Sequence, residues 1–134
     1  YLSQRLLELK YQYDHISVGV IAPYREQVDY MKSYDREFSQ LKTSYDIDIS
    51  TIDSFQGQER DIICISLVRS NDEGNIGFLK DYRRINVALT RAKKMLIVIG
   101  DSATLSQDNF YNQWLDYCHA HNTYKSAWEF MGEL

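Results

Sequence analysis

Two short runs of this sequence are apolar from end to end, and they constrain the fold more than any other feature. Residues 62–68 read IICISLV and residues 95–99 read MLIVI. Runs of this length without polar alternation are typical of strands covered on both faces, as in a parallel sheet. Residues 17–22 (SVGVIA), closed by Pro23, predict a third strand, and residues 47–52, which alternate Ile with polar residues, predict a fourth.

Helical spacing separates these runs. Apolar residues recur three or four positions apart in four segments, and this spacing predicts amphipathic helices. Their apolar positions are Leu2, Leu6, Leu9 and Tyr13; Val28, Met31, Phe38 and Leu41; Ile85, Ala88, Leu89 and Ala92 after Asp81; and Phe110, Trp114, Tyr117 and Cys118 after a cap at Ser102. The alternation of strands and helices predicts an α/β fold with a mostly parallel sheet between helical layers.

The length of 134 residues and a hydrophobic content of 44% fit one compact domain. The formal net charge of −4 argues against a basic surface over the whole domain. Five basic residues nevertheless fall close together: Arg83, Arg84, Arg91, Lys93 and Lys94. Contact with a polyanion is therefore expected to be local. No apolar run approaches about 18 residues, so we expect no membrane partner.

The two cysteines predict neither a disulfide framework nor a metal site. Cys64 lies inside an apolar run and is expected to be a small buried hydrophobe. Cys118 belongs to the sequence Cys-His-Ala-His, which has ligand-type side chains but no partner cluster elsewhere. We expect no bound metal, reduced cysteines and a cytoplasmic protein.

Candidate binding residues follow the predicted strands. In open parallel sheets, ligands gather at the carboxyl ends of the strands. This rule predicts that Pro23–Gln27, Asp53–Arg60 and the loop after Val68 lie at one edge. Arg84 and Arg91 lie seven positions apart on one helix, and we expect both to reach the same edge.

Residue type alone leaves two interpretations open for these groups. Arg84 and Arg91 suit either a solvated helix surface or a phosphoryl-transfer site that needs charge beside a γ-phosphate. Residues 51–59 (TIDSFQGQE) suit either an ordinary polar turn or a site that contacts phosphates through hydroxyls and a ribose through a carboxylate.

Together, three stretches resemble motifs of the superfamily 1 helicases. Residues 21–27 (IAPYREQ) resemble motif IV, residues 51–61 with DSFQGQERD resemble motif V, and residues 83–93 (RRINVALTRAK) resemble motif VI. Gly77-Phe78-Leu79 strengthens the resemblance to the branch with the RNA-decay helicases and their DNA-acting relatives. The resemblance covers about Val18 to Leu105.

The resemblance implies that residues 1–134 are the C-terminal RecA-like domain of a P-loop NTPase motor. In that family ATP and Mg²⁺ lie between two such domains. The second domain supplies an arginine finger, which by motif position is Arg91. The residues implied to face the nucleotide are Gln56, Gly57, Glu59 and Arg84, and those implied to contact single-stranded DNA or RNA are Tyr24, Thr51 and Ser54.

A phosphate-binding sequence of the type GxxxxGK(S/T) is absent from these 134 residues. We therefore expect that the chain is excised from a larger helicase, that its partner is the N-terminal RecA-like domain of the same polypeptide, and that alone it hydrolyses no ATP and holds no tightly bound cofactor. Two other hypotheses stay open: a non-catalytic protein-interaction module of doubly wound fold, and a small flavodoxin-like enzyme. The sequence does not distinguish DNA from RNA.

Overall fold

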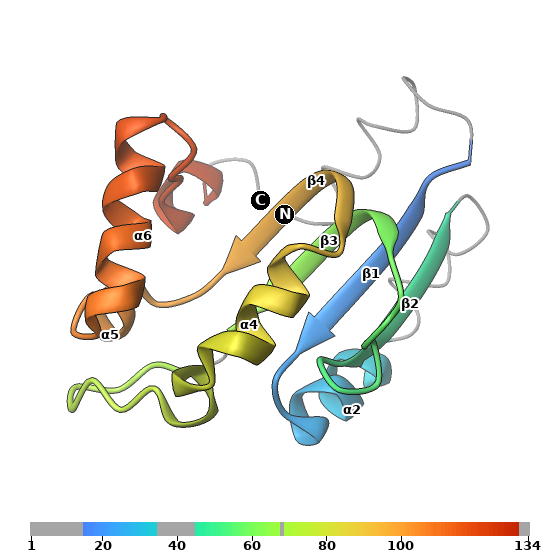
Figure 1. Cartoon of the computed structure of the whole chain (residues 1–134), viewed down its shortest axis with the longest axis horizontal. Helices are drawn as coiled ribbons and strands as arrows, with labels where there is room; N and C mark the ends of the chain where they lie inside the picture. The colour runs from blue at the N-terminus through green and yellow to red at the C-terminus, as the bar shows by residue number, and fades with distance from the viewer. Residues whose placement is uncertain (1–14, 35–44, 68, 132–134) are drawn as a thin grey trace.

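The computed structural model describes residues 15–34, 45–67 and 69–131. Within these ranges four strands form one sheet, in the order β2-β1-β3-β4 (Figure 1). The strands are β1 (Ser17–Ala22), β2 (Asp46–Thr51), β3 (Arg60–Ser66) and β4 (Ala92–Ile99). Each neighbouring pair is parallel, so the predicted α/β class and parallel sheet are confirmed.

Helices cover the sheet on both faces. They are α2 (Arg25–Ser33), α4 (Tyr82–Leu89), α5 (Ser102–Leu105) and α6 (Asn109–Ala120), with 3₁₀ helices η1 (Gly77–Lys80) and η2 (Ala127–Phe130). In Figure 1, α2 and α4 lie on opposite sides of the strands. The helix predicted from Leu2 to Tyr13 lies outside the described residues, and so do Phe38 and Leu41.

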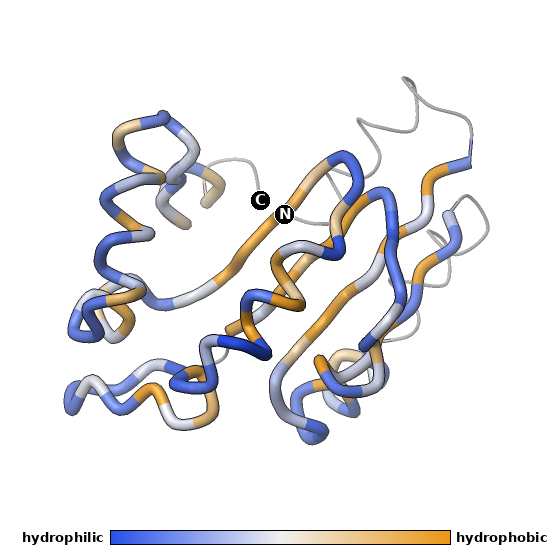
Figure 2. Tube along the Cα trace, in the orientation of Figure 1, coloured by the Kyte–Doolittle hydropathy of each residue, from blue (hydrophilic) through white to orange (hydrophobic). Residues whose placement is uncertain are grey.

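The two faces of the sheet build two apolar clusters. On the side of α2 the buried residues include Val18, Val20, Val28, Ile49, Ile62 and Cys64. On the side of α4 they include Ile21, Phe55, Ile63, Ile65, Ile85 and Tyr111. Figure 2 shows that hydrophobic residues are concentrated along the strands. Full burial of one such aliphatic side chain stabilises the fold by about 1.5–3 kcal/mol. Cys64 is buried as predicted, and this burial raises the pKa of its thiol to about 12.

β4 is less covered than its sequence predicts. Leu96 is 37% exposed and Ile99 is 47% exposed. The reason is position, because β4 pairs with β3 on one side and forms the edge of the described sheet. An apolar run therefore indicated a strand correctly but did not reveal its place in the sheet.

The last predicted helix is two helices, and the predicted cap is wrong. Ser102 is the first residue of α5, and the carboxylate of Asp101 accepts the hydrogen bond from the Ala103 amide at 3.0 Å. Asp108 caps α6 in the same way, accepting from the amides of Phe110 and Tyr111. Both carboxylates satisfy amides that a helix start leaves without partners, and Asp101 lies one residue before the predicted cap.

Candidate functional site

The segment that resembles motif V crosses one face of the sheet. Thr51 pairs with Ala22 at the carboxyl end of β1, whereas Ile62 pairs with Val18 near its amino end. Since β2 and β3 run parallel, the connection between them must return along the full strand length. The prediction that Asp53–Arg60 lies at one edge is therefore wrong: Asp53 lies at the carboxyl edge and Arg60 at the amino edge.

Helix α4 runs beside this segment and joins the same two edges (Figure 1). At the carboxyl edge, Arg84 Nε lies 3.6 Å from Asp53 Oδ1. At the amino edge, the Arg91 carbonyl accepts a 3.2 Å hydrogen bond from the Arg60 amide. Arg84 and Arg91 thus serve opposite edges, and the prediction of a shared edge is wrong. The helix ends at Leu89, so Arg91 lies in the turn that leads into β4.

Local hydrogen bonds and one buried ring shape the turn after β2. The Thr51 hydroxyl donates to Ser54 Oγ at 2.9 Å and accepts from the Ser54 amide at 3.2 Å. Phe55 is 1% exposed and packs against β1, where Gly19 leaves room: a Cβ there would lie 2.9 Å from the Phe55 ring. Gly57 has φ +78°, a conformation that glycine adopts without strain.

Gln56 faces a hollow between this turn and α4. The hollow has a volume of about 420 Å³ and is lined by Ile52, Asp53, Gln56, Arg83, Arg84 and Val87. Gln56 is exposed, and its side chain makes no hydrogen bond to another described residue. The structure thus brings Gln56 and Arg84 together in one hollow, with polar groups available to a ligand.

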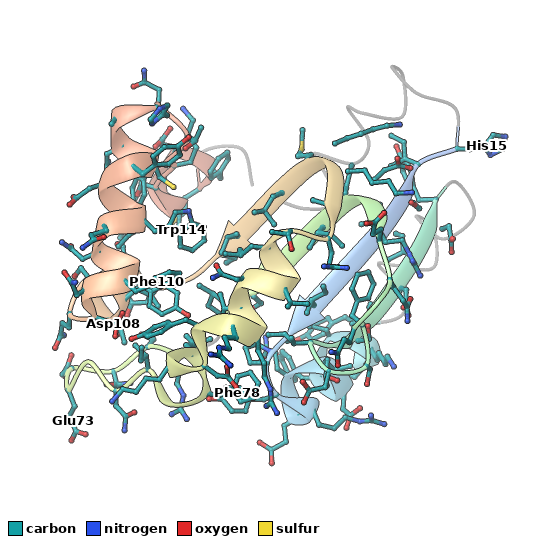
Figure 3. The ribbon with its side chains drawn as sticks, viewed as in Figure 1. His15, Glu73, Phe78, Asp108, Phe110 and Trp114 are labelled. Carbon is teal, nitrogen blue, oxygen red and sulfur yellow. The ribbon has the colours of Figure 1, made fainter. Side chains whose placement is uncertain are left out.

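The Arg84 guanidinium is held by three neighbours. Its Nε lies 3.2 Å from Asp81 Oδ2 and 3.6 Å from Asp53 Oδ1. Its Cζ lies 5.1 Å from the centre of the Phe78 ring. Figure 3 draws Phe78 beside the first turn of α4. The Arg84 side chain is 48% exposed, so it is oriented but remains reachable from solvent.

Glu59 and Arg91 lie on neighbouring segments at the amino edge. Glu59 is exposed and its carboxylate contacts no other described residue. Arg91 is half-buried, and its Nε donates to the Val87 carbonyl at 3.0 Å. Arg91 forms no ion pair within residues 15–34, 45–67 and 69–131. A carboxylate without a contact to a described residue and a guanidinium without an ion pair to one therefore lie on adjoining segments.

Tyr24 lies at the carboxyl edge, between β1 and α2. Its hydroxyl accepts hydrogen bonds from Arg69 Nε at 3.1 Å and from the Phe78 amide at 3.2 Å. A second hollow of about 560 Å³ adjoins it, lined by Tyr24, Glu26, Gln27, Arg69, Ser70 and Asn71. The candidate strand-contacting residues Tyr24, Thr51 and Ser54 thus share one edge.

Comparison with known proteins assigns the family. The family model described as an AAA domain matches residues 2–103. The chain is 44% identical over 104 residues to the DNA polymerase alpha-associated DNA helicase A of Saccharomyces cerevisiae, which covers 76% of this chain and 15% of that protein. The chain belongs to the superfamily 1 helicases.

Other relatives agree with this helicase assignment. Helicase sen1 of Schizosaccharomyces pombe is 44% identical over 104 residues, covering 74% of this chain and 6% of the relative. Regulator of nonsense transcripts 1 of Dictyostelium discoideum is 43% identical over 102 residues, covering 75% of this chain and 8% of the relative. The chain therefore spans between 6% and 15% of the length of these three proteins. Its parallel sheet with flanking helices is that of a RecA-like helicase domain.

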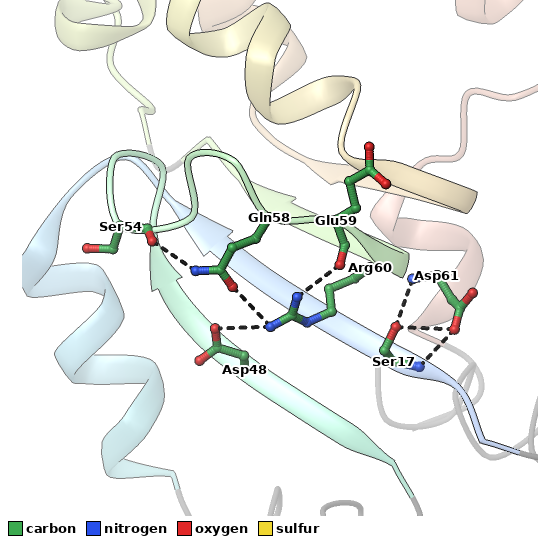
Figure 4. Close-up of polar contacts among 7 residues, drawn as sticks. All are labelled: Ser17, Asp48, Ser54, Gln58, Glu59, Arg60 and Asp61. Atoms are coloured by element: carbon green, nitrogen blue, oxygen red, sulfur yellow. Dashed lines mark hydrogen bonds and ion pairs between the residues drawn. The ribbon is translucent and has the colours of Figure 1, made fainter.

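Sequence reasoning missed the role of Arg60 in this helicase domain. Its Nη2 donates to Gln58 Oε1 at 3.1 Å and lies 3.8 Å from Asp48 Oδ2, and its Nη1 donates to the Glu59 carbonyl at 2.9 Å (Figure 4). Gln58 Nε2 in turn donates to the Ser54 carbonyl at 3.2 Å. Arg60 thus braces the segment that carries Gln56 and Glu59. Arg60 belongs to the stretch that resembles motif V, but nothing in that stretch predicts these contacts.

Arg69 and Phe78 were also missed as site residues of the helicase domain, although Phe78 belongs to a stretch that supported the resemblance. Neither residue type signals that it contacts Tyr24, since the contacts join positions 45 and 54 residues apart.

The described part of the helicase domain has neither a metal-ligand cluster nor a membrane-spanning helix. The described residues contain no group of three or more His, Cys, Asp and Glu side chains arranged to hold a metal ion. His119 and His121, from the Cys-His-Ala-His stretch, instead stack on Tyr124 and Tyr117. None of the described helices combines the length and apolarity needed to cross a bilayer.

Proposed function

We propose that this chain is the second RecA-like domain of an ATP-dependent DNA or RNA helicase, and that it completes an ATP site shared with a first RecA-like domain of the same polypeptide. The observation that carries the proposal is the junction at the amino edge. There the Arg60 amide bonds to the Arg91 carbonyl, and neither the Glu59 carboxylate nor the Arg91 guanidinium forms an ion pair with a described residue.

Arg91 acts as the arginine finger in this proposal. Phosphoryl transfer spreads negative charge over the γ-phosphate oxygens, and a permanently charged guanidinium stabilises that charge. An arginine engaged by a carboxylate of its own domain would have to break that pair first. Arg91 has no such pair, and the bond from its Nε to the Val87 carbonyl orients the group while leaving both terminal nitrogens for phosphate.

Gln56, Gly57, Glu59 and Arg84 face the nucleotide. The carboxylate of Glu59 can accept hydrogen bonds from ribose hydroxyls, and Gln56 can both donate and accept. Gly57 lets the turn place these two side chains outward, because its left-handed backbone leaves the space around its Cα open. Arg84 borders the hollow that contains Gln56 and brings positive charge to it.

Tyr24, Thr51 and Ser54 contact the phosphates of a single strand at the carboxyl edge. The Tyr24 hydroxyl accepts two hydrogen bonds, and its own proton can be donated to a phosphate oxygen. The Ser54 hydroxyl accepts from Thr51 and likewise keeps its proton. In this proposal the strand contacts lie at the carboxyl edge, and the nucleotide contacts run from Arg84 and Gln56 beside it to Glu59 and Arg91 at the amino edge.

Closure of the two domains around ATP, and reopening after hydrolysis, would move the strand by a ligand-driven shift between two domain arrangements. Mg²⁺ would be held by carboxylates of the first domain and would supply positive charge that offsets the charge of the phosphates. Residues of this chain then close the nucleotide from the opposite side.

The test is strand-stimulated ATPase activity of the full-length protein that contains this chain. We expect stimulation by single-stranded DNA or RNA, and its loss in Arg91→Ala. Full activity in Arg91→Ala contradicts the finger assignment. Absence of any ATPase activity in the intact protein contradicts the helicase proposal and favours the protein-interaction module.

A further inference from the structure

Three segments of the chain converge on the hydroxyl of one tyrosine. Tyr24 follows β1, Arg69 follows β3, and Phe78 belongs to η1, just before α4. Arg69 Nε and the Phe78 amide both donate to the Tyr24 hydroxyl, at 3.1 and 3.2 Å. A single oxygen atom therefore links the carboxyl ends of two neighbouring strands to the loop that precedes α4.

Ring contacts reinforce these hydrogen bonds. The Arg69 guanidinium lies 5.2 Å from the centre of the Tyr24 ring. The Tyr24 and Phe78 rings meet edge to face, with centres 6.0 Å apart. Cation–π and edge-to-face contacts of this kind each contribute attraction beyond the apolar area they bury. Tyr24, Arg69 and Phe78, which we name the edge cluster, are thus joined through the ring and the hydroxyl of the tyrosine.

The segment before α4 approaches the Arg69 side chain closely at Gly77. Gly77 has φ +51°, and a Cβ at this position would lie 2.5 Å from Arg69 Nη2. A residue with a side chain would therefore displace the arginine as well as strain the backbone. The close approach of Gly77 to Arg69 fixes where Phe78 enters the cluster.

The Phe78 ring also contacts Arg84. The Arg84 Cζ lies 5.1 Å from the ring centre, and the guanidinium also pairs with Asp53 and Asp81. Both carboxylates are largely exposed, and exposed ion pairs hold a long side chain only weakly. The partly buried ring, fixed by Tyr24, is the one rigid surface among these three contacts.

We propose that the edge cluster positions Arg84: Tyr24 fixes the backbone and ring of Phe78, and the ring fixes the guanidinium that faces the nucleotide. This inference rests on the proposed function, because it takes Arg84 to be a nucleotide-facing residue. Tyr24 and Phe78 are positioning residues here, acting through Arg84. The cluster also contains the tyrosine proposed to contact the strand, so strand and nucleotide contacts share one support.

The test compares variants of Phe78 in the full-length protein. Phe78→Leu keeps an apolar side chain but removes the ring, and we expect a KM for ATP about twofold to fivefold higher with kcat changed less. Phe78→Tyr keeps the ring and should restore the wild-type KM. Tyr24→Phe removes the shared acceptor and should raise KM in the same direction.

Comparison of the double variant with the single variants tests the proposal more sharply, because their effects on KM should not add. Tyr24→Phe combined with Phe78→Leu should be no worse than Phe78→Leu alone, since both changes interrupt one chain of contacts. Tyr30→Phe is the matched control: Tyr30 lies on α2, and its hydroxyl is 2.9 Å from that of Tyr34 on the surface. This control should leave KM and kcat unchanged.

A second measurement does not depend on turnover. Phenylglyoxal modifies accessible arginines, and mass spectrometry reports the labelling rate of Arg84 separately. We expect faster labelling of Arg84 in Phe78→Leu and a wild-type rate in Phe78→Tyr. Equal labelling in all three proteins, or an unchanged KM in Phe78→Leu while Arg84→Ala raises it, overturns the positioning role. Lack of ATPase activity in the wild type, with faster labelling in Phe78→Leu, overturns the proposed function and leaves the positioning of Arg84 supported.

Discussion

The amide of Arg60 donates a 3.2 Å hydrogen bond to the carbonyl of Arg91. This bond continues the pairing of β3 with β4, in which Arg60 lies opposite Ala92. Glu59 and Arg91 are therefore fixed relative to one another by the register of two strands, rather than by flexible loops. A site that must place a carboxylate and a guanidinium around one ligand gains precision from such support.

Arg91 is expected to give the largest single effect on turnover in the full-length protein. Arg91→Ala should lower kcat by roughly 10³–10⁵-fold, the range for arginine fingers. Arg91→Lys should be nearly as damaging, because an ammonium group offers a point charge in place of a planar fork. The measurement is strand-stimulated ATPase at saturating ATP.

Arg83→Ala is the matched control for this prediction. Arg83 is exposed on α4 and lines the hollow with Gln56, yet forms no ion pair with a described residue. It should alter turnover far less than Arg91→Ala. An Arg91→Lys enzyme that keeps more than about a tenth of wild-type turnover would rule out the finger assignment.

Two glutamines two positions apart should separate coupling from stability. Gln56 makes no side-chain hydrogen bond to a described residue, so Gln56→Ala should leave the melting temperature near normal and abolish stimulation by the strand. Gln58 bonds to Ser54 and Arg60, so Gln58→Ala should lower the free energy of unfolding by about 1–2 kcal/mol. Both quantities are measured on both variants. Lost stability with full stimulation in Gln56→Ala contradicts its coupling role.

The sequence predicted the strands of the sheet correctly, but it did not predict at which edge of the sheet the site residues lie. Runs such as IICISLV are governed by burial on both faces, which is a local property of composition. The place of Arg84 and Arg91 depends instead on the direction in which α4 returns across the sheet, and on where the helix ends. Arg91 was predicted within the helix because Ala92 continues its apolar spacing, but Ala92 pairs with Arg60 in the sheet. Tertiary pairing outweighed helical periodicity at this boundary.

Gly19 should tolerate no side chain, for a reason that the motifs do not reveal. An alanine Cβ at this position would lie 2.9 Å from both Ile63 Cδ1 and the Phe55 ring. Gly19→Ala should therefore destabilise the domain by about 1–3 kcal/mol through overpacking. Because Phe55 anchors the turn that carries Gln56, KM for ATP should rise as well. Unfolding in denaturant measures the first effect and steady-state kinetics the second.

Gly57→Ala is the comparison for Gly19. A Cβ at Gly57 meets nothing within 4 Å, so the substitution affects only the backbone, at φ +78°. The expected cost is about 1–2 kcal/mol, the price of a left-handed conformation in a residue with a side chain. Wild-type stability in Gly19→Ala would show that β1 and Phe55 adjust more freely than this packing indicates.

The candidate site was predictable as a set of residues but not as an arrangement. Motif spacing singled out Gln56, Glu59 and Arg91 by resemblance, and neither charged side chain of the three forms an ion pair with a described residue. Their supports, Arg60 and Phe78, act through contacts that depend on the folded chain, such as the guanidinium of Arg60 over the Phe55 ring at 5.2 Å. Such contacts have no periodicity and therefore no signature in a single sequence.

Purified residues 1–134 should show no ATPase activity. The chain contains no GxxxxGK(S/T) sequence to hold the β- and γ-phosphates, and an arginine finger without that cradle has no transition state to stabilise. The check is phosphate release with and without single-stranded DNA and RNA. Turnover that disappears in Arg91→Ala would contradict this expectation, whereas turnover unaffected by Arg91→Ala would indicate a contaminating enzyme.

Lowering the pH should reduce the free energy of unfolding of the domain by protonating Asp61, which lies at the amino edge of the sheet. Asp61 Oδ2 accepts from the Ser17 amide at 3.1 Å and from the Ser17 hydroxyl at 3.2 Å (Figure 4). Asp61 Oδ1 lies 3.3 Å from Lys94 Nζ. The Ser17 amide, followed by Lys94, holds the pKa of the Asp61 carboxyl below its usual value despite partial burial. A carboxyl whose pKa is lower in the folded state stabilises the fold above its unfolded pKa of about 3.9. That contribution is lost as the pH falls from about 4 through the lower pKa of the folded state.

Denaturant unfolding of wild type and Asp61→Asn between pH 7 and pH 3 measures this contribution. Asn cannot ionise, so Asp61→Asn should be less stable than wild type at pH 7, and the difference should shrink as the pH falls through the folded pKa of Asp61. Asp72→Asn, at an exposed loop position without an ion pair to a described residue, should follow the wild-type profile. A difference between wild type and Asp61→Asn that stays constant with pH would mean that Asp61 supports Ser17 through hydrogen bonding alone, with no contribution from its charge.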